Sequence, residues 1–252
     1  MAFGSWGSET KSALSNGWRW LAAAPILLAA VWAAGPFIPV GGRVPTRGPV
    51  DQHEIALTFD DGPNPLVTPK VLDILDHYGA KGTFFLVGEN VRRHPDTASL
   101  IVERGHEVGN HSQSHGNFLP YYLPQFITRD FDRAEAEITD ATGLMPRIYR
   151  APHGRVTPWM RVALRVHGVV MIRWDYSPRD WEQVAPDELV RRVTAAARNG
   201  GVILMHDGLD LNDSPDRSNT VEALPRIIET LQARGFRLVT VAELFKQEPY
   251  AR

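Results

Sequence analysis

The 252-residue chain contains no cysteine. This absence excludes disulfide bonds, thiolate metal ligands and cysteine nucleophiles, so any metal ion must be held by histidine and carboxylate side chains. The chain also lacks an excess of either charge, because 27 lysines and arginines stand against 29 aspartates and glutamates. Nucleic-acid binding usually depends on a basic surface, and we therefore expect no nucleic-acid partner.

Charge is also missing from one long stretch near the N-terminus, between Trp20 and Val40. Its central part, residues 21–34, is apolar throughout. The pattern predicts an export signal, with residues 1–20 as a cytoplasmic or n-region and residues 21–40 as a cleaved signal peptide or a retained membrane anchor. The charges that flank the segment do not decide between these two. In both cases the rest of the chain is expected in the cell envelope outside the cytoplasm, either anchored to the membrane or free in the periplasm or extracellular space.

Glycine and proline are frequent in residues 41–52, a composition typical of a linker. A single catalytic domain is expected at residues 53–248, in which short apolar runs alternate with longer amphipathic stretches. The predicted strands are residues 55–59, 82–87, 107–109, 147–149, 169–174, 202–205 and 237–239. The predicted helices are residues 67–78, 96–104, 124–142, 158–167, 186–199 and 217–234. Such alternation predicts an α/β fold with a parallel sheet that closes into a barrel, whose chemistry lies at the carboxyl ends of the strands.

Carboxylate and imidazole side chains follow two of these predicted strands. Asp60 and Asp61 come at the end of the first strand, where two adjacent carboxylates repel unless a cation or a shared proton relieves them. His111 and His115 follow the third strand, and histidines four apart on a helical turn can bind one ion. Alone, the aspartate pair also suits a solvated turn, and a histidine pair also occurs on solvated helices. Together they predict a catalytic metal site with positions open for water and substrate.

Three further motifs come after three other predicted strands. Arg150 is suited to holding a neighbouring carboxylate ionised, and the turn Pro152–Gly154 is suited to aiming a backbone NH at an oxyanion. The aromatic rings of residues 174–181 suit core packing as well as substrate contact. His206 ends the sixth strand, where a lone histidine is more often structural than catalytic. Because the strand ends of a barrel meet at one cleft, the five motifs together predict an enzyme.

The ordered motifs TFDDG, HSQSH, RAPHG, DYSPRDW and LMHD resemble those of the polysaccharide deacetylases, the NodB homology domain of carbohydrate esterase family four. The resemblance covers residues 53–245 and implies an irregular (β/α) barrel of seven or eight parallel strands. It implies a divalent metal ion, with Zn²⁺ favoured over Co²⁺ or Ni²⁺, bound by Asp61, His111 and His115. It also implies that Asp60 is the general base, oriented by Arg150, and that His206 is the general acid, oriented by Asp180. The His153 backbone NH would be the oxyanion donor, and the walls of the acetyl pocket would be Pro152, Trp181 and Leu204.

The activity that this resemblance implies is removal of acetyl groups from a polysaccharide containing N-acetylglucosamine by metal-activated water. We also expect the chain to act as a monomer. Peptidoglycan, chitin oligomers and an exopolysaccharide remain open as substrates. Three alternatives also remain: an O-acetyl esterase acting on a glycan such as acetylxylan, a non-catalytic glycan-binding protein, and a small-molecule amidohydrolase. One departure concerns His153, which stands where family members commonly have an aromatic ring, and the change affects how a sugar is expected to pack.

Overall fold

The computed structural model describes residues 44–251, and in that range its strands form one parallel seven-stranded sheet. The order is β5-β4-β3-β2-β1-β6, and β7 pairs with the start of β1. The strands are β1 (Glu54–Gly62), β2 (Gly82–Leu86), β3 (Glu107–Asn110), β4 (Ile148–Tyr149), β5 (Val170–Met171), β6 (Gly201–His206) and β7 (Arg237–Leu238). The α/β fold with parallel strands is therefore confirmed, and each predicted strand is present.

The two ends of the sheet, β5 and β6, are joined through the chain that follows β5, which makes the fold an irregular barrel. The chain that follows β5 reaches the free side of β6, where Tyr176 forms a parallel bridge with Ile203. The Leu204 amide donates a hydrogen bond of 2.9 Å to the Tyr176 carbonyl at this junction. Because β4 and β5 have only two residues each, the strands on this side of the barrel pair over short lengths. The longer strands β1, β2 and β6 form its regular side.

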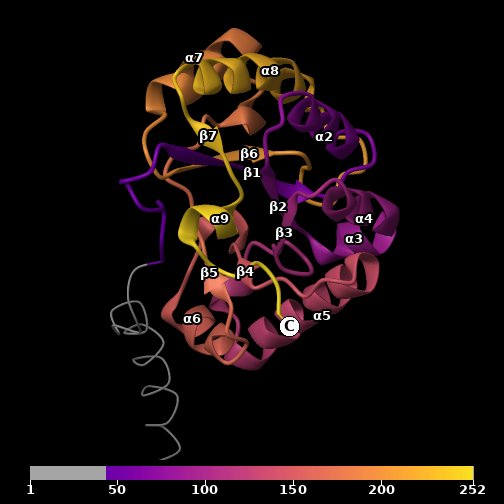
Figure 1. The fold of residues 1–252 in the computed structure, drawn as a ribbon. Coiled ribbons are helices and arrows are strands. Elements are labelled where there is room, and N and C mark those ends of the chain that lie inside the picture. Colours follow the sequence, from indigo (N-terminus) through magenta and orange to yellow (C-terminus); the bar gives the residue numbers. More distant parts are fainter. Residues whose placement is uncertain (1–43, 252) are drawn as a thin grey trace, which may run out of the picture. The chain divides into compact units, whose positions relative to one another are not determined.

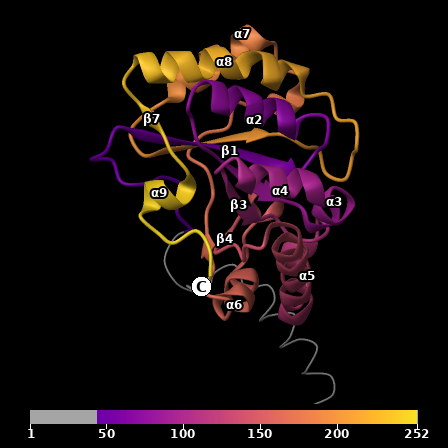
Figure 2. The ribbon, with the colours of Figure 1, turned by 45° about the vertical axis from the view of Figure 1, so that its right-hand side comes forward.

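Helices surround the strands, as Figures 1 and 2 show. They are α2 (Thr68–His77), α3 (Gly88–Arg93), α4 (Pro95–Glu103), α5 (Pro124–Thr142), α6 (Pro158–Arg165), α7 (Pro186–Ala196), α8 (Ser218–Ala233) and α9 (Val241–Phe245). Proline in the first turn marks the start of five of them, and α5 ends at Gly143, whose φ of 71° favours glycine. The sequence did not predict α3 and α9, because helices of six and five residues are too short to show a helical period.

Strand β1 places one of the expected catalytic residues inside the barrel. Ile55, Leu57 and Phe59 pack in the cluster formed with the surrounding helices, whereas Ala56 packs in a separate cluster with β2, β6 and the chain after β5. Side chains alternate between the two faces of a strand, so Thr58 and Asp60 share the inner face with Ala56. Asp60 is thus directed into the barrel near the carboxyl end of β1.

The described part of the predicted linker, residues 44–52, lies against the barrel. Gly48 donates a backbone hydrogen bond to Gly200, and Arg173 donates one to Pro45, each at 2.8 Å. The packed unit therefore begins before residue 53. The predicted n-region and signal or anchor segment, residues 1–20 and 21–40, lie outside the described residues. Among residues 44–251, no helix has both the length and the apolar character needed to cross a membrane.

Candidate active site

A cavity of about 380 Å³ lies at the carboxyl ends of the strands and is lined by side chains from the predicted motifs. Four groups of polar residues reach it: Asp60 and Asp61 from the end of β1, His111 and His115 from the loop after β3, His153 from the loop after β4, and His206 from the end of β6. Its other walls are Trp174, Trp181, Leu204, Leu209, Asp210 and Arg217. Residues far apart in the sequence thus meet in one cleft.

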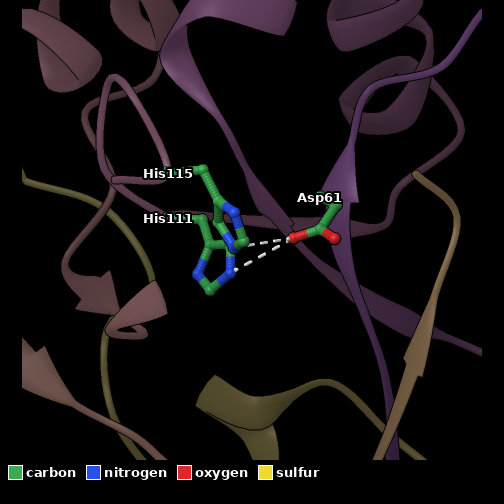
Figure 3. A group of neighbouring side chains, drawn as sticks. All are labelled: Asp61, His111 and His115. Carbon is green, nitrogen blue, oxygen red and sulfur yellow. Dashed lines mark ion pairs between the residues drawn. The ribbon is translucent and has the colours of Figure 1, made fainter. Parts of the chain in front are cut away.

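Asp61, His111 and His115 form the one group of potential metal-binding side chains found among the described residues (Figure 3). Their donor atoms all lie within 4.8 Å of one another. The Nε2 atoms of both imidazoles face Asp61 Oδ1, at 3.5 Å from His111 and 3.1 Å from His115. All three residues are buried, which shields the group from competing water.

The predicted helical turn at His111 to His115 is wrong. The chain there forms a loop, in which the Asn110 side-chain oxygen accepts a hydrogen bond from the Ser112 amide and the Ser112 hydroxyl oxygen accepts one from the His115 amide. Ser112 and His115 both have a positive φ, a conformation that helices do not contain. These side-chain contacts replace helical hydrogen bonds. The centroids of the His111 and His115 rings nevertheless lie 5.0 Å apart.

The donor set fits a divalent cation. The Nδ1 atom of His111 donates to the Arg150 carbonyl at 2.7 Å, so its Nε2 atom keeps a free electron pair towards Asp61. Burial alone would raise the pKa of Asp61, but the hydrogen bonds with His111 and His115 hold that pKa well below its usual range. Burial alone would lower the pKa of His115, but its contacts with Asp210 and Asp61 raise it to about 10. Both shifts mean that the carboxylates favour a positive charge at this position, as a metal ion would supply.

Asp60 is bound through one of its oxygens by a fully buried arginine. Arg150 Nη1 donates to Asp60 Oδ1 at 2.7 Å and to the Thr58 hydroxyl at 2.8 Å. The guanidinium also lies over the ring of Phe85, 4.0 Å from its centroid. The second carboxylate oxygen of Asp60 lies 3.6 Å from His111 Nε2 and so remains directed towards the cavity.

His206 has a carboxylate partner of its own on the other side of the cavity. Asp180 lies at the start of the 3₁₀ helix η4 (Asp180–Glu182), and its two oxygens accept from the His206 amide and contact the His206 Nδ1 atom, both at 2.8 Å. The Thr220 hydroxyl also donates to Asp180. Burial alone would lower the pKa of His206, but the charge and hydrogen bond of Asp180 outweigh it and raise the pKa to about 9. The imidazole is therefore protonated at neutral pH.

Trp181, Leu204 and His153 line this cavity, as predicted, whereas Pro152 does not. Trp181 packs edge-on against His206, with ring centroids 5.2 Å apart, and the buried Leu204 lines the same wall. Pro152 is buried within the turn and is not among the residues that line the cavity. His153 adopts a positive φ of 54°, and its ring centroid lies 4.5 Å from that of His115.

Sequence reasoning missed Leu209, Asp210 and Arg217, which lie in and after the loop that follows β6. Nothing in the pattern of residues 207–217 marks them, because aspartate, glycine and asparagine there are ordinary loop residues. Trp174 was predicted to pack in the core or to contact substrate, with the core at least equally favoured, and the structure places it both in the core and at the cavity. It packs against the inner apolar cluster and also lines the cavity.

Comparison with known proteins identifies the family. Residues 47–172 match the family described as polysaccharide deacetylase. The chain is 35% identical over 213 residues to a peptidoglycan-N-acetylglucosamine deacetylase of Bacillus cereus, covering 81% of this chain and 94% of that protein. It is 35% identical over 216 residues to a chitooligosaccharide deacetylase of Bradyrhizobium sp. (strain ANU 289), covering 82% and 98%.

A solved structure of a deacetylase has a similar fold. The crystal structure of a peptidoglycan N-acetylglucosamine deacetylase in complex with a naphthalenyl N-oxidanyl-benzamide matches with a TM-score of 0.77 and 31% identity, covering 82% of this chain and 94% of that one. Both kinds of comparison thus agree with the motifs and with the barrel. The chain belongs to the polysaccharide deacetylase family and is a hydrolase of that family.

Proposed function

We propose that this protein removes acetyl groups from the amide nitrogen of N-acetylglucosamine residues in a polysaccharide, with the help of a divalent metal ion. One observation carries the proposal: Asp61 faces two imidazole Nε2 atoms, while the adjacent Asp60 gives one oxygen to Arg150 and directs the other into the cavity. Only Asp61 lies between both imidazoles and only Asp60 is bound by Arg150, which suits one carboxylate to metal binding and the other to proton transfer.

Asp61, His111 and His115 are the residues that would hold the ion. Three protein ligands of nitrogen and oxygen are typical of a catalytic zinc site, and we propose Zn²⁺, with Co²⁺ or Ni²⁺ as the alternatives. When bound, such an ion lowers the pKa of water and polarises the acetyl carbonyl.

Asp60 is the general base in this proposal. Arg150 occupies its Oδ1 atom, so the Oδ2 atom is the one available to take a proton from the attacking water. The arginine also fixes the orientation of the carboxylate through this charge-assisted hydrogen bond. The backbone NH of His153 is proposed as the donor to the oxygen of the acetyl group as negative charge develops on it.

His206 is the general acid. Its Nδ1 atom is directed at Asp180, which leaves Nε2 to give a proton to the nitrogen that departs. Proton donation matters more for an amide than for an ester, because an unprotonated amide nitrogen is a poor leaving group. A histidine whose pKa is raised to about 9 is charged at neutral pH and ready for this step. Trp181 and Leu204 form the apolar walls that receive the acetyl methyl group.

The substrate class follows from the relatives. Those relatives are deacetylases of peptidoglycan and chitooligosaccharide, both of which carry N-acetylglucosamine, and we keep an exopolysaccharide as a third candidate. We further propose that the chain acts outside the cytoplasm, because residues 21–40 have the composition of a signal or anchor.

Acetate release tests this function. The purified full-length chain, supplied with Zn²⁺, Co²⁺ or Ni²⁺, is incubated with chitin oligomers, peptidoglycan and acetylxylan, and free acetate is measured. We expect release from one of the N-acetylated glycans, loss of release after chelation and recovery when the metal is returned. Release from acetylxylan alone would instead support an O-acetyl esterase. Binding of glycans without any release would support a non-catalytic protein, and activity that survives complete chelation would refute the metal mechanism.

A further inference from the structure

The two histidines of the metal-binding group point in similar directions. Each directs Nε2 at Asp61 Oδ1 and turns Nδ1 outwards to an oxygen atom. For His111 that outer oxygen is the backbone carbonyl of Arg150. For His115 it is a side-chain oxygen, Oδ1 of Asp210, which lies 2.5 Å away as an ion-pair contact and not as an aligned hydrogen bond. An outer partner of this kind fixes which ring nitrogen carries the proton and fixes the plane of the ring.

The loop that carries Asp210 is tied directly to the metal-binding aspartate. The Asn90 side-chain amide donates two hydrogen bonds of 2.8 Å, one to the Asp61 carbonyl and one to the Asp210 carbonyl. The Asp210 amide donates to Asp61 Oδ2 at 3.3 Å. Gly208 packs so closely that an added Cβ would lie 2.2 Å from the Asp61 carbonyl oxygen. The loop is therefore set at a fixed distance from Asp61.

The support continues one step further from the site. Asn90 lies buried in α3, and its side-chain oxygen accepts a hydrogen bond from Arg93 of the same helix. Arg93 also donates to the Leu211 carbonyl at 3.1 Å, next to Asp210. Helix α3 thus holds both Asp61 and the loop that contacts His115, although neither α3 nor this loop belongs to the five motifs.

We propose that Asp210, held in place by Asn90, is a positioning residue that orients His115 for metal binding. It acts on the ion only through the histidine. This inference rests on the proposed function of the same site, and it assigns to the loop after β6 a task in building the metal centre. Removal of the carboxylate frees the His115 ring to rotate and to exchange its tautomers, so the protein should hold the ion less tightly.

The test measures Zn²⁺ affinity of the metal-free full-length protein, by competition with a chromophoric chelator. Asp210 has a φ of 46°, a conformation that asparagine tolerates well, so Asp210→Asn removes the charge with little backbone cost. Asp210→Ala removes the oxygen as well. We expect Asp210→Ala to weaken Zn²⁺ binding by about 10- to 100-fold, and Asp210→Asn to weaken it by less, because its amide oxygen can still lie against His115 Nδ1.

Asp213 provides the matched control, because it lies three residues further along the same loop and contacts Arg93 and His94 rather than His115. Asp213→Ala should bind Zn²⁺ like the wild type. The visible spectrum of the Co²⁺-loaded protein gives a second readout, which should change in the Asp210 variants and not in Asp213→Ala. The proposal is overturned if Zn²⁺ affinity in Asp210→Ala stays within about threefold of the wild type, or if Asp213→Ala loses as much. Failure of the wild type to bind any metal would instead overturn the proposed function.

Discussion

Arg150 and Asp60 form a buried ion pair in the interior of the barrel, with Nη1 of the arginine 2.7 Å from Oδ1 of the aspartate. Neither side chain is more than 4% exposed. A buried charge is costly unless it is paired, so the two residues depend on each other. Asp60 lines the proposed catalytic cavity, and Arg150 fixes the direction of its carboxylate there.

The first prediction concerns stability. Replacement of Arg150 by methionine keeps much of the side-chain volume but leaves Asp60 without its cation. We expect the free energy of unfolding to fall by about 3–5 kcal/mol, because breaking one half of a buried pair leaves an uncompensated charge. Urea unfolding of the metal-free protein measures this. Arg191→Met is the control, since Arg191 pairs with Glu188 on the surface and its loss should change little. A loss of less than about 1 kcal/mol in Arg150→Met would show that the buried pair is not important for stability.

The second prediction separates proton transfer from metal binding. Asp60→Asn preserves the shape of the side chain but removes its ability to act as a base. We expect kcat to fall by about 10²- to 10⁴-fold while the bound Zn²⁺ per chain stays as in the wild type. Asp61→Asn should instead lower the amount of bound Zn²⁺ per chain, because it alters a proposed metal ligand. Acetate release and elemental analysis of the same samples provide both measurements, and unchanged turnover in Asp60→Asn would remove Asp60 from the role of base.

The third prediction concerns pH. The pKa of His206 is raised to about 9, above its ordinary value of 6.5, so the imidazole is protonated below that pH and loses its proton as the pH rises through it. A general acid must be protonated, and the rate should therefore fall on the alkaline side. Asp61 and Asp60 contribute to the raised pKa, and a bound cation opposes them, so we expect the fall at or below pH 9.

Asp180→Asn tests the cause of this shift. The substitution removes the charge that raises the pKa of His206, so the alkaline fall in kcat should move to lower pH. Thr220→Val removes only a hydroxyl that donates to Asp180, and its profile should move much less. A profile that stays in place in Asp180→Asn would mean that another group, and not His206, sets the alkaline limit.

The sequence predicted the regular parts of this fold because their cause is local. Strand β1 is buried at all nine positions, and its apolar run is typical of a parallel strand covered on both sides. Helix α5 matches its predicted bounds because proline starts it and Gly143 ends it. The short strands β4 and β5 are weaker cases, since two residues carry no period and their pairing depends on the closed barrel.

The site was predicted only in part, and for a physical reason. Motif residues such as Asp61 and His111 are recognisable because each follows a predicted strand, and strand ends converge in a barrel. The contact of Asp210 with His115 joins two loops 95 positions apart, and no local pattern indicates it. The loop between His111 and His115 was misjudged for a related reason, because spacing alone does not distinguish a helical turn from a loop held by Asn110 and Ser112.

The fourth prediction concerns His153, the one departure from the usual motif. Its ring lies beside His115, and it lines the cavity that the sugar must enter. Only the backbone NH is proposed to act on the acetyl oxygen, so His153→Tyr should change KM for chitin oligomers more than it changes kcat. The reason is that a larger ring alters the packing of the sugar while the turn, set by Gly154 against Trp174, keeps the NH in place. Kinetics on oligomers of increasing length measure the effect. If kcat instead collapses with KM unchanged, the imidazole itself takes part in the reaction, and the oxyanion role of the backbone NH would have to be revised.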